Sequence, residues 1–246
     1  WLIITIEISH RELLAKLLIC LEANKRGWGC IIASRQAICA NFKKLPKGLF
    51  LVKSALKIDE PYIAEAVRHG HKVFCLDEEG LVRRQIDDFA GRRITLTNMQ
   101  RLSGYFVWGE DMEQIVFKRY NEFKQKLINT GHPRIDIWTG KHNYVFENQI
   151  MQIKQKYKNI ILVITTLGRY NHYLGKGMGI KLPAKLNKLN QDEIKLLVDS
   201  EKYTKQIYES FIKLVPILSE KFSNNSIIIR VHPAENDKPW LEIAND

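Results

Sequence analysis

The chain has 246 residues, 45% of them hydrophobic and 26% charged, which is typical of a folded protein and argues against a disordered one. Lysine and arginine outnumber aspartate and glutamate by 38 to 27, giving a formal charge of +11. This excess favours phosphate-bearing partners such as a nucleotide, nucleic acid or anionic lipid, although a solvated lysine-rich surface has the same composition. No apolar run approaches the roughly 18 residues that a membrane-spanning helix needs.

The four cysteines indicate a reducing environment. They lie in apolar segments, form no C-x-x-C pair and have no histidine at zinc-ligand spacing: Cys20, Cys30, Cys39 and Cys75. We therefore expect reduced thiols, a cytoplasmic protein and no metal site. Because the chain begins with Trp1 rather than Met, we expect the native N-terminus to lie upstream, and a targeting signal stays open.

The first half of the chain alternates strand-like and helix-like segments. The expected strands are Leu2–Ile6, Cys30–Ala33, Gly48–Val52, Lys72–Leu76 and Tyr105–Trp108. The expected helices include one that Gly27 ends, a short one at Glu60–His69 and a long one at Glu110–Ile128. This alternation predicts a parallel sheet with crossover helices.

The first helix begins with Ser9-His10-Arg11-Glu12, the S-x-x-E form of a capping box, in which Ser9 and Glu12 would satisfy free backbone N–H groups. Its leucines recur at helical spacing and predict an apolar face: Leu13, Leu14, Leu17, Leu18 and Leu21.

The second half predicts a further α/β unit. Lys141–Lys158 is a polar helical pattern, followed by strands at Ile160–Thr165 and Ile227–Val231 with a long helix around Asp192–Leu218 between them. We expect two Rossmann-like lobes with a cleft between them: a first lobe at 1–140, a linker helix at 141–158 and a partial second lobe at 159–246. The second lobe has about two of the five or six strands of a doubly wound domain.

An acidic turn follows the strand at Lys72–Leu76. Asp77, Glu78 and Glu79 lie where parallel strands open onto a binding crevice, and Gly80 would permit a positive φ. Clustered carboxylates repel one another, so one could serve as a general base, whereas an ordinary acidic turn would use them to cap the next helix. His10 and Arg11 occupy the equivalent turn of the first strand, as crevice residues or as exposed first-turn residues.

A His-Pro turn follows the last strand. His232 could donate to a phosphate oxygen, Arg230 adds charge and Pro233 fixes the exit path, although the pair also suits an ordinary strand end. The pair His132-Pro133 shows how common the dipeptide is, and we expect it to be structural. The loop after Ile160–Thr165 could cradle an anion through small, hydroxylated or basic residues: Thr166, Gly168, Arg169 and His172.

Several motifs are absent from the sequence: G-x-S-x-G, H-E-x-x-H, the Walker A pattern and the Asp-x-Asp that holds a metal on a sugar nucleotide. A metal-independent mechanism fits this sequence, with cationic side chains and helix dipoles stabilising a departing phosphate.

Several stretches that together cover most of the chain carry a family likeness: WLIITIEISHRELLAKLLICLEANKRGW, SRQAI, LPKGLFLVKS, GHKVFCLDEEGL, YFVWG, TGHPRID, TTLGRYNHYLG and RVHPAEN. They resemble bacterial surface carbohydrate biosynthesis proteins, which are similar to capsule-type glycosyltransferases of the two-lobed GT-B fold. Bacterial sialyltransferases of that fold carry a [DE]-[DE]-G motif that supplies the base and an HP motif that binds the CMP of the donor. Glu78-Glu79-Gly80 and His232-Pro233 match these motifs in order. The Ser/Thr-rich donor-binding stretch of such enzymes is not found here.

The resemblance implies transfer of a CMP-activated nonulosonic acid, such as a sialic, pseudaminic, legionaminic or Kdo-like sugar, to a glycan or lipid-linked glycan. Glu78, or Asp77 if the turn is shifted, would deprotonate the acceptor, and His232 would bind the leaving phosphate. Peripheral association with the inner membrane fits the positive charge, with no nucleic acid involved. The alternatives are a GT-B sugar-nucleotide epimerase or CDP-polyol phosphotransferase, and a non-catalytic basic module that binds glycan or membrane.

Overall fold

The computed structural model describes residues 1–80, 89–179, 181 and 189–245. The chain forms two compact units, Trp1–Val145 and Phe146–Asp246, which we call unit 1 and unit 2.

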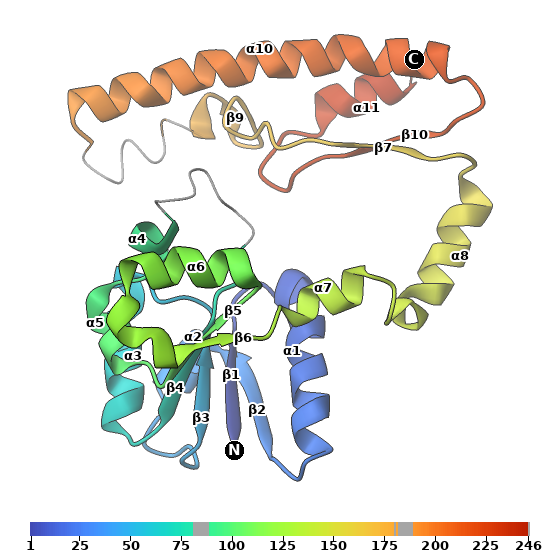
Figure 1. The fold of residues 1–246 in the computed structure, drawn as a ribbon. Helices are drawn as coiled ribbons and strands as arrows, with labels where there is room; N and C mark the ends of the chain where they lie inside the picture. The colour runs from blue at the N-terminus through green and yellow to red at the C-terminus, as the bar shows by residue number, and fades with distance from the viewer. Residues whose placement is uncertain (81–88, 180, 182–188, 246) are drawn as a thin grey trace. The chain divides into compact units, whose positions relative to one another are not determined.

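Unit 1 is built on a parallel sheet of apolar strands (Figure 1). The strands are β1 (Leu2–Ile6), β2 (Cys30–Ser34), β3 (Leu49–Val52), β4 (Lys72–Leu76), β5 (Gly104–Val107) and β6 (Leu127–Asn129). Their order is β2-β1-β3-β4-β5-β6, and every pairing is parallel. The order reverses between β1 and β3, which makes that point the topological switch of a doubly wound sheet. The predicted Rossmann-like α/β architecture is confirmed for this unit.

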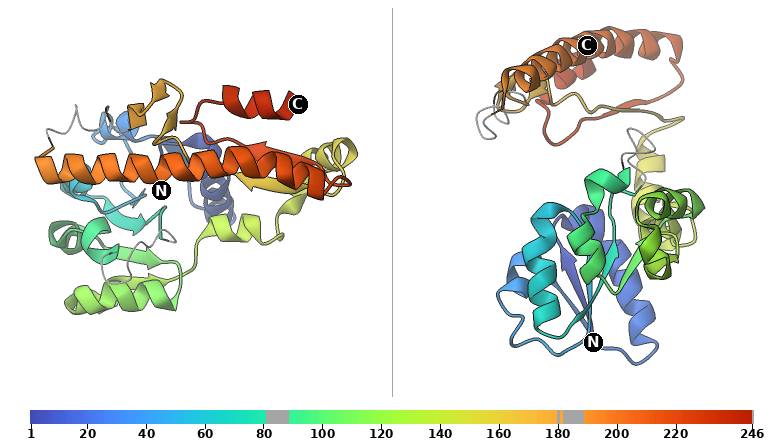
Figure 2. Two further views of the ribbon diagram at one scale, coloured as in Figure 1. Left: turned by 90° about the horizontal axis from the view of Figure 1, so that it is seen from above. Right: turned by 60° about the vertical axis from the view of Figure 1, so that its left-hand side comes forward.

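Helices cover the two faces of this sheet unequally. Unit 1 contains α1 (Ser9–Asn24), α2 (Arg35–Cys39), α3 (Glu60–Arg68), α4 (Phe89–Arg93), α5 (Leu96–Arg101), α6 (Glu110–Arg119) and α7 (Pro133–Trp138), with 3-10 turns at Lys57–Asp59 and Asn121–Lys126. A further 3-10 turn, Asn143–Phe146, spans the boundary between the two units. The larger core takes side chains from α2 to α6, whereas α1 packs on the smaller core at the other face. The right-hand view of Figure 2 shows α1 and α3 on opposite sides of the sheet.

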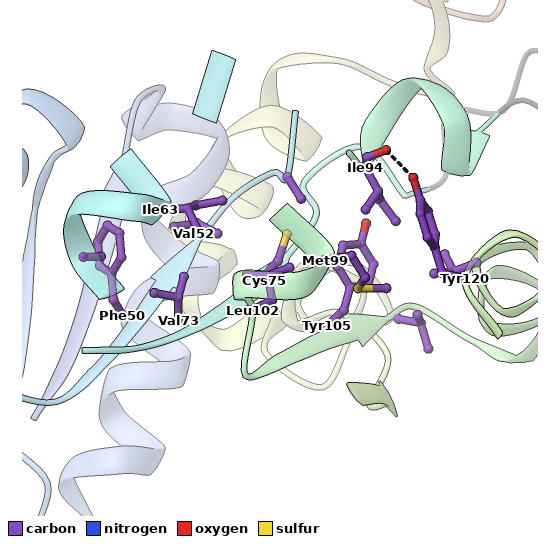
Figure 3. Packing of buried hydrophobic residues seen from close by; sticks show 14 of the residues in the cluster. Phe50, Val52, Ile63, Val73, Cys75, Ile94, Met99, Leu102, Tyr105 and Tyr120 are labelled. Atoms are coloured by element: carbon purple, nitrogen blue, oxygen red, sulfur yellow. Dashed lines mark hydrogen bonds between the residues drawn. The ribbon is translucent and has the colours of Figure 1, made fainter. Parts of the chain in front are cut away.

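The two cores follow from the alternation of side chains along each strand. Ile3 and Phe50 point into the larger core, and their neighbours Ile4 and Leu51 point into the smaller one. Figure 3 shows the larger core around the fully buried Tyr105.

The predicted helix Glu110–Ile128 is present only as far as Arg119. Helix α6 ends at Arg119, because Tyr120 leaves helical geometry and buries its ring, where its hydroxyl donates a 2.7 Å hydrogen bond to the carbonyl of Ile94 (Figure 3). After one 3-10 segment the chain forms β6, whose three residues pair with β5. This strand is too short for its pattern to stand out in the sequence.

The predicted orientation of the first helix is wrong. In α1 the charged side chains of Glu12 and Lys16 are buried, whereas Leu13, Leu14, Leu17 and Leu21 are exposed. The capping box is absent as well, since the N-cap is Ile8 and Glu12 accepts instead from the backbone N–H of Glu7 at 3.2 Å. The helix turns its charged side inward because Lys16 pairs with a buried carboxylate of the acidic turn.

Unit 2 contains the predicted strands and long helix. Its elements are α8 (Glu147–Lys156), β7 (Ile161–Ile164), β8 (Asn171–His172), β9 (Gly175–Lys176), α10 (Gln191–Lys221), β10 (Ile227–Arg230) and α11 (Lys238–Asn245). Strands β7 and β10 pair in parallel, and β8 and β9 form a small antiparallel pair. Helix α10 begins with a capping box in which Asn190 and Glu193 each accept from the other's backbone N–H at 2.9 Å. The hydrophobic core of unit 2 centres on Leu167, Tyr208, Val215 and Trp240.

The four cysteines are free thiols, and Cys20 and Cys75 are buried, as predicted for core thiols. None of the helices in the described ranges is long and apolar enough to cross a membrane.

Candidate functional site

The acidic turn lies at the carboxyl edge of the unit 1 sheet, close to the topological switch. The backbone N–H of Glu78 donates to the carbonyl of Lys53, just beyond β3, at 3.1 Å. Lys53 in turn forms an ion pair with Glu7, just beyond β1, and Glu7 also pairs with Arg35 at 3.1 Å. Charged residues that follow three neighbouring strands therefore meet at one edge, where ligands bind in sheets of this type. The described part of the turn ends at Gly80, and Leu81 lies outside it.

Asp77 is a structural carboxylate. Its side chain is buried and receives two hydrogen bonds from Arg93, at 3.0 and 3.1 Å, and a third from the backbone N–H of Glu79 at 2.8 Å. Burial raises the pKa of Asp77, and the Arg93 guanidinium opposes that rise. The indole N–H of Trp108 donates to the Asp77 carbonyl at 2.7 Å, so the backbone of the turn is fixed too.

Glu78 is buried among cationic or polar side chains from two helices. Its carboxylate lies 2.5 Å from Lys16 Nζ on α1, pairs directly with Arg134 on α7, and lies 3.6 Å from His132 Nε2. Burial alone would raise the pKa of Glu78, but His132 and Lys16 lower it to about 2. A carboxylate that is inaccessible, ion-paired and so weakly basic is a poor general base, so the geometry does not favour the catalytic role expected for Glu78.

His132 has the structural role predicted for the first His-Pro pair. It caps α7 by accepting from the Arg134 backbone N–H at 3.1 Å through Nδ1, and Pro133 follows as the first helical residue. Its ring stacks on Trp108 with centroids 4.0 Å apart. Burial lowers the pKa of His132, so the ring is neutral at neutral pH with its proton on Nε2, toward Glu78.

Glu79 is the solvent-facing carboxylate of the turn, with 42% of its side chain exposed. Arg93 donates to one of its oxygens at 3.1 Å, and Arg11 lies 4.0 Å from the other. His10, the neighbour of Arg11 at the start of α1, is exposed. The predicted grouping of the acidic turn with the first turn of α1 is therefore present, and it centres on Glu79.

Gly80 is needed for space and not for a positive φ, which corrects the expectation from sequence. A Cβ at this position would lie 2.7 Å from the ring of Trp108. The close packing of this glycine against the indole fixes the exit of the turn beside Glu79.

In unit 2, the loops that follow the two parallel strands lie side by side. The backbone N–H of Thr165 donates to the carbonyl of Arg230 at 3.2 Å. Glu235 then joins the loops, because its buried carboxylate accepts from the Thr165 hydroxyl at 2.8 Å and from the Leu167 backbone N–H at 2.7 Å. Gly168 packs so closely on this junction that a Cβ there would lie 3.1 Å from the carbonyl of Ala234.

The predicted nucleotide-binding residues gather around this junction. His232, Pro233, Arg230 and Thr166 are exposed at its edge. The Nδ1 atom of His232 accepts from the backbone N–H of Ala234 at 3.1 Å, so Nε2 carries the proton of the neutral ring.

The two remaining predicted residues are engaged within unit 2. His172 accepts from the backbone N–H of Leu174 at 3.1 Å and forms a β-bridge with Glu235, which places it at the same junction. The guanidinium of Arg169 pairs with the hydroxyl of Ser200 on α10.

Four residues that organise these sites were not predicted from sequence: Lys16, Arg93, Arg134 and Glu235. Glu235 had a usable signal, since it lies three residues after His232 in the same turn. Lys16 had none, because a lysine among leucines is expected on the solvent side of a helix. In the part of the chain that the structure covers, no three His, Cys, Asp or Glu side chains gather as metal ligands.

Comparison of the chain with known proteins identifies no relative. No protein-family model, curated protein or solved structure matches the chain.

Replacing Glu78 by glutamine should destabilise the protein by about 3–5 kcal/mol, because Lys16 and Arg134 would be left without a buried counter-charge. The free energy of unfolding in urea measures the effect. The matched control is Glu79→Gln in the same turn, where partial exposure limits the change to about 1 kcal/mol or less. Equal losses for the two variants would contradict the difference in burial.

Stability should also fall steeply in acid. The pKa of Glu78 is about 2 when folded and ordinarily 4.5, so its contribution is complete above pH 4.5 and disappears as the pH falls toward 2. The difference corresponds to about 3 kcal/mol. Urea unfolding at several pH values should show a smaller acid loss in Glu78→Gln than in the natural sequence. Parallel pH profiles would show that other groups cause the acid loss.

Proposed function

We propose that the chain is a metal-independent glycosyltransferase of the GT-B type that acts in bacterial surface polysaccharide biosynthesis. In this proposal unit 1 supplies the base for the acceptor and unit 2 binds the nucleotide of the donor. The donor is a CMP-activated nonulosonic acid, and the acceptor is a glycan or a lipid-linked glycan at the inner face of the cytoplasmic membrane. The family resemblance of the two turns supplies the sugar and nucleotide class.

The observation that carries the proposal is the division of the acidic turn into two buried carboxylates and one partly exposed carboxylate. Asp77 and Glu78 are held in ion pairs and fix the backbone, whereas Glu79 is accessible at the carboxyl edge of the sheet. Arg11 and Arg93 flank Glu79 and set its orientation. A positioned, accessible carboxylate is what deprotonation of an acceptor hydroxyl requires.

The transfer step uses Glu79 as the base. The acceptor oxygen forms a bond to the anomeric carbon, its proton passes to Glu79, and the bond between the anomeric carbon and the CMP oxygen breaks. The departing phosphate keeps the electron pair of that bond. Arg11 and Arg93 each lie beside one oxygen of Glu79, so the carboxylate is held in place before the transfer.

The junction in unit 2 suits a phosphate. His232 offers a ring N–H, Thr166 an exposed hydroxyl and Arg230 a positive charge, all at the ends of two paired strands. These donors stabilise the charge that grows on the leaving phosphate. Glu235 joins the two loops through its hydrogen bonds with Thr165 and Leu167, which holds the donors in place as the charge develops.

Glu79→Gln should lower the turnover number with CMP-sugar by about 100-fold or more, as expected when a general base is removed. The assay is release of CMP by the full chain with a CMP-sugar and a glycan acceptor. The matched control is Glu65→Gln, which removes another partly exposed carboxylate paired with an arginine, on α3. Turnover of UDP-sugar alone would contradict the CMP assignment, and full activity of Glu79→Gln would contradict the role of the base.

His232→Ala should weaken CMP binding by about 10-fold or more, the loss expected for one hydrogen bond to a charged phosphate. Isothermal titration calorimetry with CMP measures it. His142→Ala, which removes a partly exposed histidine of unit 1, should bind CMP like the natural sequence. Unchanged affinity in His232→Ala would remove His232 from the phosphate site.

A further inference from the structure

The outward side of α1 carries a row of exposed leucines, which we call the leucine face: Leu13, Leu14, Leu17 and Leu21. These residues are 36–50% exposed, although other residues of the same helix are buried. They lie within three turns of one helix side, so they form one patch and not scattered single contacts. Contiguous apolar surface of this kind marks an interaction site.

The leucine face cannot turn inward. The opposite side of α1 is fixed by Lys16, which lies 2.5 Å from the buried Glu78, and by Glu12, which accepts from the backbone N–H of Glu7. Rotating the helix to bury the leucines would break both contacts and would leave the buried Glu78 without the charge of Lys16. The exposure of the leucines is therefore built into the fold of unit 1.

A tryptophan lies just beyond the C-terminal end of the same helix. The inward side of α1 differs from the leucine face, because Ile19 and Ala23 pack against the smaller core there and line a cavity of about 420 Å³ together with Leu51 and Phe106 of the sheet. Trp28, which follows the helix, also lines this cavity and is itself half-exposed. Leucine together with tryptophan is the composition of helices that lie in the interface of a lipid bilayer.

The charges around the leucine face select its partner. Between Leu13 and Leu21 the sequence has no aspartate or glutamate. Arg11 precedes the face, and Lys25 and Arg26 follow it, sharing the single carboxylate of Glu22. A second copy of this chain, also at +11, would bring like charges together at both helix ends, whereas an anionic surface complements them.

We propose that the leucine face is a membrane-docking surface, on which α1 lies in the headgroup region of a bilayer that contains anionic lipid. The leucines enter the boundary between headgroups and acyl chains, and the basic residues at both ends contact lipid phosphates. The N-terminal end of α1 carries Arg11, which lies 4.0 Å from Glu79. The docked helix would thus place the acidic turn near the lipid surface. The docking itself does not depend on the proposed transfer reaction.

Vesicle co-sedimentation of the full chain tests the proposal. The natural sequence should bind vesicles of phosphatidylcholine with 30% phosphatidylglycerol, and should bind pure phosphatidylcholine at least about 10-fold more weakly. The double variant Leu14→Gln, Leu17→Gln should lose at least about 10-fold in affinity for the anionic vesicles, since two inserted side chains become polar. Circular dichroism checks that the variant is folded, which exposed positions permit.

The matched control is Leu196→Gln on α10, which changes a 72% exposed leucine of unit 2 and should leave vesicle binding unchanged. Equal binding of the double variant and the natural sequence would overturn the proposal, as would equal binding to neutral and anionic vesicles. Analytical ultracentrifugation gives a further outcome: a dimer of the natural sequence that the double variant loses would make this face a contact between copies. Because no sugar donor is present, failure here is separate from failure of the transfer reaction.

Discussion

The buried ionic cluster around Glu78 is the constraint on which the rest of unit 1 depends. The Glu78 carboxylate, just beyond β4, forms ion pairs with Lys16 of α1 and Arg134 of α7, and His132 Nε2 lies 3.6 Å from it. Charges removed from water in this way cost several kcal/mol each unless all partners are in place. The cluster therefore fixes the rotation of α1, the start of α7 and the path of the acidic turn together.

The same constraint explains why three consecutive acidic residues differ so much. Asp77 and Glu78 point into the protein toward separate cations, so their charges are neutralised locally and the turn cannot move. Glu79 shares Arg93 with Asp77 and its backbone N–H is bound to Asp77, but its side chain is partly exposed at the surface. A rigid turn with one accessible carboxylate is better suited to chemistry than three mobile ones, because the reactive group needs no reorganisation.

The sequence was informative where local patterns agreed with tertiary structure. Apolar runs placed β1, β4, β7 and β10 to within a residue or two, and their alternation with helices predicted the parallel sheet. It misled where a distant partner overrode the pattern. The leucines of α1 follow the pattern of a helix whose apolar side faces the core. The ion pair of Lys16 with Glu78, 62 positions away, instead turns the charged side of the helix toward the core and the leucines toward solvent. The role of each carboxylate in the acidic turn could not be predicted for the same reason, since Lys16, Arg93 and Arg134 are remote in sequence.

Both units use one device at the carboxyl edge of their strands. In unit 1 the buried Glu78 holds its turn through cations, and its neighbour Glu79 is partly exposed. In unit 2 the buried Glu235 holds two loops through a hydroxyl and a backbone N–H, and His232, three residues earlier, is exposed. The two anchors differ in strength, because Glu78 is neutralised by full charges whereas the donors to Glu235 among the described residues are neutral. A buried carboxylate compensated by neutral donors is held less tightly. Of the two turns, the one that carries His232 is therefore the one that a bound anion would order further.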